Sequence, residues 1–449
     1  MAEGAGADAA LLAEAVARSR DVRAIELGAG TVAGTGRLWR QVIGPKPALI
    51  VADENTWAAA GAAVTAALDA AEIPHRREVL PGRPRLKPDR ALGARLAGLA
   101  APGEAFLALG AGVINDVTKY AAFTADRPFL CVATAASMDG YSSAGAPLVD
   151  RGFKITIACR PAVAVLADLD IIAAAPPGMA GWGYGDMAGK IPAGADWIIA
   201  DALGIEAVDD IAWPMVQGGV RRWLARPGAV AAGERGALAE LFTGLALVGL
   251  AMEAHGSSRP ASGADHQIAH LWEMEDLTHE GERVSHGACV AVGCVAVLRL
   301  YDWLLARDLS GLDAGALARA APGIDTRRAQ IAAAFTHPDI AARAAEETAA
   351  KTVGAGTLRA RLETLSRAWP DLRARLSGQV ITADRMADML RAAGAPAAPG
   401  EIGVTRAHLR RTVAAARFLR RRYTVLDLLE EAGLLKAALD DCFGREGEG

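Results

Sequence analysis

Residues 105–116 read AFLALGAGVIND, an apolar run followed by a turn with two glycines and the start of a helix. The five residues from Ala105 to Leu109 carry no polar side chain, which is typical of a parallel strand covered on both faces. Gly110 and Gly112 allow a tight turn and a close ligand, and the N–H groups of the helix start favour an anion. The third glycine of the common dinucleotide-binding fingerprint is missing, so this stretch alone predicts a strand–turn–helix unit whose turn is either structural or phosphate-binding.

The same pattern continues on both sides of this stretch. Apolar strands are predicted at 48–52, 129–133 and 163–167, each followed by a polar residue, with helical sequence between them. Alternating strands and helices indicate a doubly wound sheet, which binds ligands at the carboxyl ends of its strands.

After residue 175 the sequence changes to Ala/Leu-rich helical segments, for example 237–254, 264–276 and 287–306. We therefore predict an α/β domain of the Rossmann-like kind, with a parallel sheet, over residues 1–175. An all-α domain is predicted over residues 176–449. Residues 309–400 carry no motif and are expected to be helical and structural.

Composition excludes several classes of function. The 449 residues are 52% hydrophobic and have a formal net charge of −4, so the chain is globular without an overall attraction to nucleic acid. The most apolar run, 241–252, is shorter than a membrane span. The five cysteines are scattered, and the first ten residues do not resemble a signal peptide. We expect a protein of the cytoplasm with no nucleic-acid partner and no membrane insertion.

Small polar residues follow two of the predicted strands. Residues 134–143 read TAASMDGYSS, which places several hydroxyls and one carboxylate in the loop after the strand at 129–133. Ligand contact is favoured over a simple helix cap, because this loop follows the strand next to the glycine turn. Asp53 and Asn55 stand at another strand end, where a ribose or adenine contact and a helix cap are equal alternatives.

The helical half contains a carboxylate and a group of histidines with the chemistry of a metal site. Asp186, His266 and His286 offer one oxygen and two nitrogen ligands, which suit Zn²⁺ or another divalent transition metal. His270 follows His266 by four residues and shares its helix face. Spacing alone leaves solvated or hydrogen-bonded histidines as an equal alternative.

Four strings of sequence together carry a resemblance to a known family. They are TAASMDG at 134–140, GYGDMAG at 183–189, SRPASGADH at 258–266 and RYTVLDL at 422–428. In these the chain resembles the sn-glycerol-1-phosphate dehydrogenases, within the superfamily of iron-dependent alcohol dehydrogenases and dehydroquinate synthases. The resemblance runs from residue 51 to about residue 305 and returns at 422–428.

The resemblance implies a role for each matching residue. It assigns the nicotinamide dinucleotide to Asn55, Gly112, Val113, Ile114, Asn115, Asp116, Thr134, Ala135, Ala136, Ser137 and Ser143. It assigns one divalent metal to Asp186, His266 and His286. Substrate contacts fall to Asp139, Asp186 and His270, of which Asp186 and His270 are also the expected catalytic residues.

The implied reaction is the reversible, metal-dependent reduction of dihydroxyacetone phosphate to sn-glycerol 1-phosphate by NAD(P)H. The metal, whether Zn²⁺, Ni²⁺ or Fe²⁺, is expected to polarise the ketone. Lys154, Lys190 and Arg259 are candidates for the substrate phosphate, with an ordinary surface or structural role as the alternative, and the basic run 417–422 is interpreted as a solvated helix end. A homo-oligomer is expected, and the product would serve the synthesis of glycerol lipids.

Three other functions remain open on the sequence. A dehydrogenase of an unphosphorylated polyol such as glycerol would share the fold, metal and cofactor. A cyclase of the dehydroquinate synthase kind would use NAD⁺ without net turnover. A non-catalytic binding protein on the same fold is disfavoured, because every expected ligand residue is present.

Overall fold

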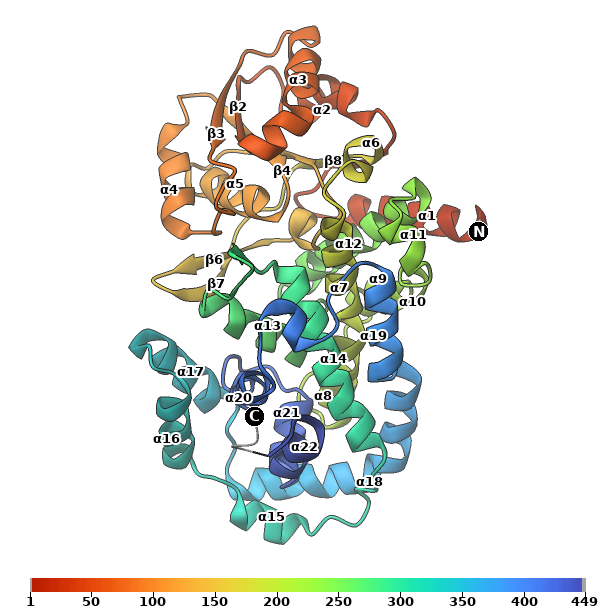
Figure 1. Ribbon diagram of the computed structural model, residues 1–449, viewed down its shortest axis with the longest axis vertical. Coiled ribbons are helices and arrows are strands. Elements are labelled where there is room, and N and C mark those ends of the chain that lie inside the picture. Colours follow the sequence, from red (N-terminus) through yellow and green to blue (C-terminus); the bar gives the residue numbers. More distant parts are fainter. Residues whose placement is uncertain (1, 446–449) are drawn as a thin grey trace. The chain divides into compact units, whose positions relative to one another are not determined.

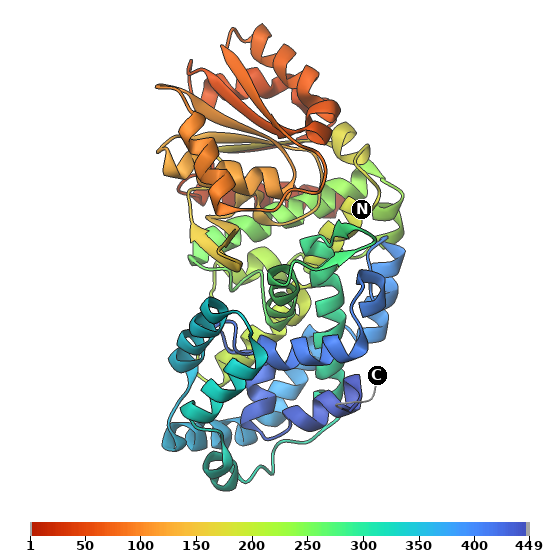
Figure 2. The same ribbon diagram turned by 60° about the vertical axis from the view of Figure 1, so that its left-hand side comes forward.

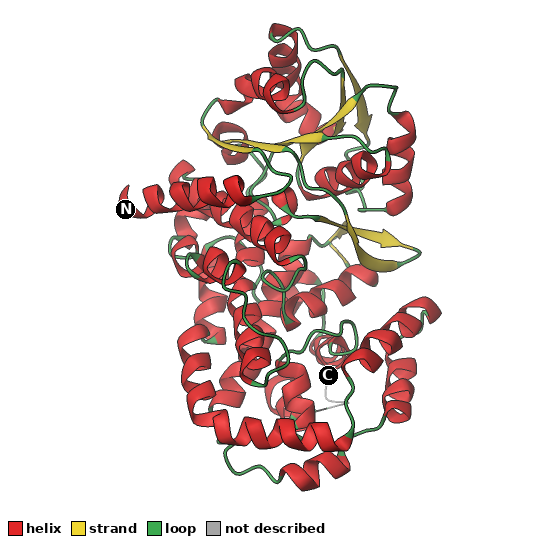
Figure 3. Cartoon of the chain, turned by 180° about the vertical axis from the view of Figure 1, so that it is seen from behind, coloured by secondary structure: helices red, strands yellow, loops and turns green. Residues whose placement is uncertain are grey.

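The computed structural model describes residues 2–445, and contacts between residues divide the chain into two compact units. Unit 1 comprises 1–187, 211–261 and 392–395. Unit 2 comprises 188–210, 262–391 and 396–449. Helices make up most of the structure (Figure 3), and the strands longer than two residues all lie between Ala24 and Asp168.

A six-stranded parallel sheet forms the centre of unit 1 (Figures 1 and 2). Its strands lie in the order β1-β8-β5-β4-β2-β3. Their bounds are β1 Ala24–Gly28, β2 Ala48–Asp53, β3 His75–Leu80, β4 Ala105–Gly110, β5 Phe129–Ala133 and β8 Ala164–Asp168. Because all six strands run in the same direction, their carboxyl ends meet at one edge of the sheet, as the sequence predicts.

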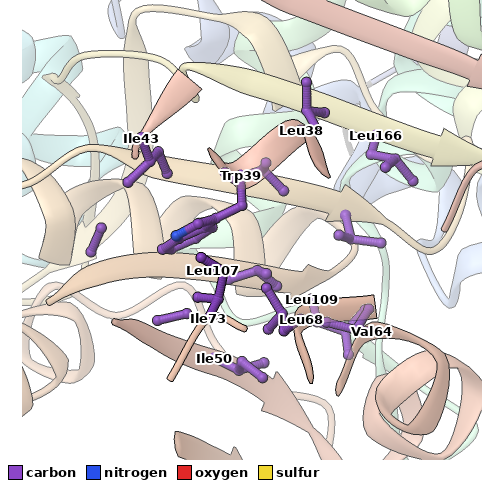
Figure 4. Packing of buried hydrophobic residues seen from close by; sticks show 14 of the residues in the cluster. Leu38, Trp39, Ile43, Ile50, Val64, Leu68, Ile73, Leu107, Leu109 and Leu166 are labelled. Carbon is purple, nitrogen blue, oxygen red and sulfur yellow. The ribbon is translucent and has the colours of Figure 1, made fainter. Parts of the chain in front are cut away.

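Alternate residues of the four central strands pack against helices on opposite faces of the sheet. One face forms a core in which strand residues such as Ile50, Leu107 and Leu166 meet Trp39 and Val64 (Figure 4). These two residues belong to the helices α2 (Thr35–Val42) and α3 (Glu54–Ala70), while α4 (Arg90–Leu99) and α5 (Gly112–Thr124) pack together along the other face. Burial on both faces explains why these strands are apolar at every position except the last residues of β2 and β8, Asp53 and Asp168.

Four strands of unit 1 were not predicted from the sequence. β1 and β3 form the two edges of the sheet, and their residues are partly exposed, so neither reads as a continuous apolar run. β6 (Gly145–Asp150) and β7 (Phe153–Ala158) form a separate antiparallel hairpin directly after the predicted ligand loop.

Further helices complete unit 1. The helices that precede, separate or directly follow the strands are α1 Ala2–Arg18, η1 Thr31–Gly34, η2 Gly140–Ser142 and α6 Leu169–Ala173. The later helices are α7 Gly178–Ala188, α9 Ala212–Gln217, α10 Val220–Trp223, α11 Pro227–Ala231 and α12 Arg235–His255.

Unit 2 is largely helical. Its helices are α8 Lys190–Ala202, α13 Ala264–Met274, α14 His286–Leu305, α15 Ala314–Ala320, α16 Ile324–Ala334, α17 Pro338–Lys351, α18 Ala355–Gln379, α19 Ala383–Ala392, η3 Pro399–Ile402, α20 Arg406–Ala416, α21 Val425–Glu431 and α22 Leu435–Phe443. The expected all-α composition is interrupted by one short hairpin, β9 (Thr278–His279) with β10 (Glu282–Arg283). The predicted helices 237–254, 264–276 and 287–306 are confirmed as α12, α13 and α14.

The change from strands to helices near residue 175 is present in the structure, but packing follows a different division. α7 and the helices α9 to α12 belong to the compact unit that contains the sheet, although they follow residue 175. The predicted boundary near residue 175 therefore marks the change from strands to helices. That residues 1–175 and 176–449 act as two functional domains stays a prediction.

Two helices are long and apolar enough to cross a membrane by length and composition. They are α12, with 21 residues, and α14, with 20. The expectation that the run 241–252 is too short was wrong about length, because it forms part of the longer α12. The most apolar windows of α12 and α14 are 72% and 78% buried, so both are core helices.

Candidate active site

The turn between β4 and α5 lies at the carboxyl edge of the sheet in unit 1. Ala111 precedes α5 in an extended conformation and provides no side-chain cap, and its carbonyl accepts the first helical bond, from Asn115 N at 3.0 Å. The N–H groups of Gly112, Val113 and Ile114 therefore have no acceptor within the helix. Such a helix start can bind a phosphate through its N–H groups and its positive dipole end.

The loop after β5 runs beside this helix start. Tyr141 donates a hydrogen bond of 2.7 Å to the carbonyl of Ala135, and burial raises the pKa of the Tyr141 hydroxyl, which keeps it protonated as a donor. Asn115 Nδ2 donates to the carbonyl of Gly140 at 3.3 Å. The start of α5 and the loop 134–143, which carry the predicted cofactor residues, are therefore joined by a hydrogen bond within unit 1.

Helix α7 packs closely against the same loop. A Cβ atom at Gly183 would lie 1.9 Å from the carbonyl oxygen of Ala136, so only glycine permits this approach. One turn further along α7, the fully buried Asp186 accepts a hydrogen bond of 3.0 Å from the backbone N–H of Asp139. The structure therefore brings together Asp139 and Asp186, two of the predicted substrate residues.

Asn55 lies in the first turn of α3, at the carboxyl end of β2. Its side chain is exposed and donates to the carbonyl of Gly82 at 3.1 Å. Asp53 caps α3 by accepting from Thr56 N at 2.8 Å, so the cap interpretation of Asp53 is confirmed. Asn55 remains open to a ligand at the edge of the sheet.

Three predicted histidines form a cluster in unit 2. The ring centroid of His266 lies 6.1 Å from that of His270 and 5.4 Å from that of His286, and the last two are 5.7 Å apart. His266 and His270 lie on α13, and His286 is the first residue of α14. The cluster therefore presents several nitrogen donors to one place.

A carboxylate accompanies two of these imidazoles. Asp265 Oδ2 lies 2.7 Å from Nδ1 of His266, and Glu273 Oε1 lies 3.1 Å from Nδ1 of His286. A carboxylate at Nδ1 fixes the proton there and leaves Nε2 as the electron-pair donor, which is the arrangement of metal-binding histidines. The chemistry of this donor set fits a divalent transition metal. The remaining predicted ligand, Asp186, belongs to α7 in unit 1.

Asp196, which sequence reasoning did not single out, ties together the helices of unit 2 around the histidines. The side chain is fully buried on α8, and Oδ2 accepts from Ala264 N at the start of α13 at 2.8 Å. Oδ1 accepts from Tyr301 Oη on α14 at 2.6 Å and from Val425 N on α21 at 2.8 Å. The only sequence signal was a lone carboxylate in the apolar stretch 195–200.

The string RYTVLDL lies against the loop that leads to His266. Arg422 Nη1 donates to the carbonyl of Ser262 at 2.6 Å, and Val425 meets Asp196 as described. The stretch 422–428 thus supports α13, the helix that carries His266, which explains why the family resemblance returns so far along the chain. The interpretation of 417–422 as a solvated helix end was wrong for Arg417, which is buried and pairs with Glu430, whereas Arg421 is exposed as predicted and pairs with Glu347.

The three candidates for a phosphate contact are all buried. Lys154 and Arg259 belong to unit 1, and Lys190 begins α8 in unit 2. An ordinary surface role is therefore excluded for all three. The five cysteines, all within the described residues, form no disulfide; four are buried and Cys442 is partly exposed.

Comparison with known proteins gives a consistent set of relatives. The family described as iron-containing alcohol dehydrogenase matches residues 14–176. A protein named glycerol-1-phosphate dehydrogenase [NAD(P)+] from Bacillus licheniformis is 30% identical over 90% of this chain and 87% of its own length. One of the same name from Bacillus velezensis is 35% identical over 58% of this chain and 67% of its own.

The fold is also found among solved structures. A probable glycerol dehydrogenase from Sinorhizobium meliloti superposes with a TM-score of 0.59 at 16% identity, covering 94% of this chain and 98% of the other. At this identity the likeness concerns the fold alone.

Proposed function

Since this chain belongs to the glycerol-1-phosphate dehydrogenase family, we propose that it reduces dihydroxyacetone phosphate reversibly to sn-glycerol 1-phosphate with NAD(P)H. The observation that carries the proposal is the near full-length relative of that name. The histidine cluster with its two carboxylates also supports it, because a divalent metal held there would polarise the ketone oxygen.

The cofactor is assigned to the carboxyl edge of the sheet in unit 1. The N–H groups at the start of α5 would hold the pyrophosphate, and the side chains of Asp116, Thr134, Ser137, Ser143 and Asn55 would contact the dinucleotide. The backbone of 112–116 and 134–137 would supply the remaining contacts. Support comes from the N–H groups that lack an acceptor within the helix and from the hydrogen bond between Asn115 and Gly140.

One divalent metal, Zn²⁺, Ni²⁺ or Fe²⁺, is assigned to Asp186, His266 and His286. Bound NAD(P)H supplies the hydride, and the metal supplies Lewis-acid polarisation of the ketone oxygen. Asp139 and Asp186 orient the substrate. His270 contacts the substrate hydroxyl and delivers the proton that balances the hydride, which makes it the catalytic residue together with Asp186.

The substrate phosphate is assigned to one or more of the buried cations Lys154, Lys190 and Arg259. A buried cation binds a phosphate strongly, because little water competes for it. We further propose that the protein works in the cytoplasm as a homo-oligomer, and that its product enters glycerol lipid synthesis.

The test follows the oxidation of NADH and NADPH by purified protein with dihydroxyacetone phosphate and, in parallel, with dihydroxyacetone. We expect turnover with the phosphorylated ketone and a product that is the 1-phosphate rather than the 3-phosphate. Faster reduction of dihydroxyacetone would replace the proposal with a polyol dehydrogenase. Cofactor binding without turnover on either ketone would contradict it in favour of a cyclase.

A further inference from the structure

Lys119 is a fully buried lysine that the proposed function does not use. It lies on α5, two turns after the glycine turn, and its side chain is 0% exposed. Its Nζ lies 2.6 Å from the carbonyl of Gly140, 3.0 Å from the carbonyl of Gly145 and 3.2 Å from Oγ of Ser143. An ammonium has three donors, and all three point at one loop.

Placing this charge in the protein interior is unfavourable. Burial lowers the pKa of Lys119, and the opposing effect of Asp116 is weaker, because its Oδ1 lies 3.9 Å from Nζ. A methionine would fill a similar volume without that cost. Packing therefore does not explain why a lysine occupies this buried position, whereas the three hydrogen bonds of its ammonium group do.

The loop held by Lys119 carries two of the residues assigned to the reaction. Asp139 and Ser143 flank Gly140, and the carbonyl of Gly140 receives a second bond from Asn115 on α5. Ser142 joins the other side of the loop to α12 by donating to the carbonyl of Ala246 at 2.7 Å. Helix α5, whose start is assigned to the pyrophosphate, thus fixes the position of the loop that is assigned to the dinucleotide and the substrate.

We propose that Lys119 is a positioning residue, which fixes the segment 139–145 relative to the start of α5 so that dinucleotide and substrate are held in register. This inference rests on the proposed function, because it presumes that a dinucleotide binds at this edge of the sheet. Lys119 itself touches neither ligand, so its removal acts through the loop.

The test compares Lys119→Met with Thr118→Val. Thr118 is the neighbouring residue on α5, is fully buried and has no hydrogen-bond partner for its hydroxyl, so its change to valine is a matched loss of a buried polar group. NADH affinity is measured by fluorescence titration, and kcat and KM for dihydroxyacetone phosphate are measured separately. Circular dichroism establishes that each variant is folded.

We expect Lys119→Met to weaken NADH binding by about 10- to 100-fold, the effect of losing charge-assisted bonds, and to raise KM more than it lowers kcat. Thr118→Val should stay within about twofold of the parent protein. Lys119→Arg, which keeps a cation with N–H donors, should recover part of the lost affinity. A folded Lys119→Met variant with parental NADH affinity and KM would overturn the proposal.

If Lys119→Met does not fold, Lys119→Gln takes its place, because its neutral amide keeps N–H donors but removes the charge. The same loss of NADH affinity is expected, and parental affinity would again overturn the inference. The parent protein is titrated first. Failure of the parent to bind NADH would contradict the proposed function, whereas equal binding by parent and variant would contradict only the role of Lys119.

Discussion

At the carboxyl edge of the sheet in unit 1, the proposed cofactor site is made mainly from backbone, whereas the proposed metal donors of unit 2 are held by charged pairs. The first site depends on the N–H groups at the start of α5, which have no acceptor within the helix, and on a glycine that lets α7 approach the loop at Ala136. The second depends on Asp265 and Glu273, each bonded to one imidazole. The backbone contacts of the first site depend on the conformation of the chain. The imidazole ligands of the second site depend on a proton held at Nδ1, which leaves Nε2 to bind the metal.

This difference predicts that the two sites fail in different ways. A change of shape in unit 1 should weaken dinucleotide binding and leave the histidines intact. A change of charge in unit 2 should weaken metal binding and leave the dinucleotide in place. Four substitutions, grouped into three tests, examine this separation in order of decreasing expected effect.

The largest effect is expected from Asp265→Asn and Glu273→Gln, measured as metal affinity by competition with a chromogenic chelator. Each amide removes the negative charge that orients the imidazole, and we expect a loss of about 10- to 100-fold. Asp265→Asn should cost more, because Asp265 is fully buried and its contact is shorter.

The control for these variants is Glu275→Gln. Glu275 also pairs with a histidine, His408, at 2.8 Å. This pair lies outside the histidine cluster, and Glu275 is more exposed than Asp265 or Glu273. Metal affinity should be unchanged in this control. Equal losses in all three variants would mean that the carboxylates act through general stability instead of through His266 and His286.

A smaller effect is expected from Gly249→Ala on α12. The new Cβ would lie 2.2 Å from Oγ of Ser142 and 2.7 Å from the carbonyl of Asp139, so the loop must move. We expect overpacking to lower the free energy of unfolding by about 1–3 kcal/mol and NADH affinity by about tenfold. Metal affinity should fall less, because the loop also bonds the proposed ligand Asp186 through Asp139 N, while His266 and His286 keep their carboxylate partners.

Gly236→Ala is the matched control on the same helix. Its Cβ would meet only Arg226 at 3.5 Å, an ordinary contact, so the alanine should be neutral or stabilising by up to about 1 kcal/mol. Thermal unfolding and NADH titration measure both quantities. An unchanged NADH affinity in a folded Gly249→Ala protein would show that the loop tolerates displacement.

The smallest effect is expected from Asn55→Ala, which removes one exposed amide at the edge of the sheet. NADH affinity should fall by about two- to tenfold, the size of a single hydrogen bond. Glu54→Ala serves for comparison, since Glu54 holds the same segment by accepting from Gly82 N at 3.1 Å. Equal effects of the two variants would mean that Asn55 acts through the segment at Gly82 and does not touch the dinucleotide.

The sequence predicts the buried parts of the fold better than its edges. β2, β4, β5 and β8 are apolar at nearly every position because helices cover both faces of the sheet. The edge strand β3 reads HRREVL, and its exposed charged residues hide it from the same reasoning. Long helices such as α12 and α14 were predicted because burial makes them apolar throughout.

For the site, the motifs predicted which residues matter but not what holds them. The bonds of Lys119 join residues about 20 positions apart, and those of Asp196 join residues up to 229 apart. No local pattern encodes such pairs, because they arise when helices pack. The signal available was a charged residue inside an apolar helix, as in VTKYAA at 117–122 and GADWIIA at 194–200. A buried charge of this kind needs a partner, which is sufficient reason to look for one.

The most direct test of the central claim, that dinucleotide and metal are held by independent means, is to strip the protein of metal with a chelator and measure NADH binding and turnover together. The account predicts that NADH affinity stays within about twofold of the untreated protein while reduction of dihydroxyacetone phosphate stops, and that added Zn²⁺ or Ni²⁺ restores the reaction. Loss of NADH binding on chelation would contradict the independence of the two sites. Undiminished turnover in the stripped protein would contradict the metal's part in the reaction.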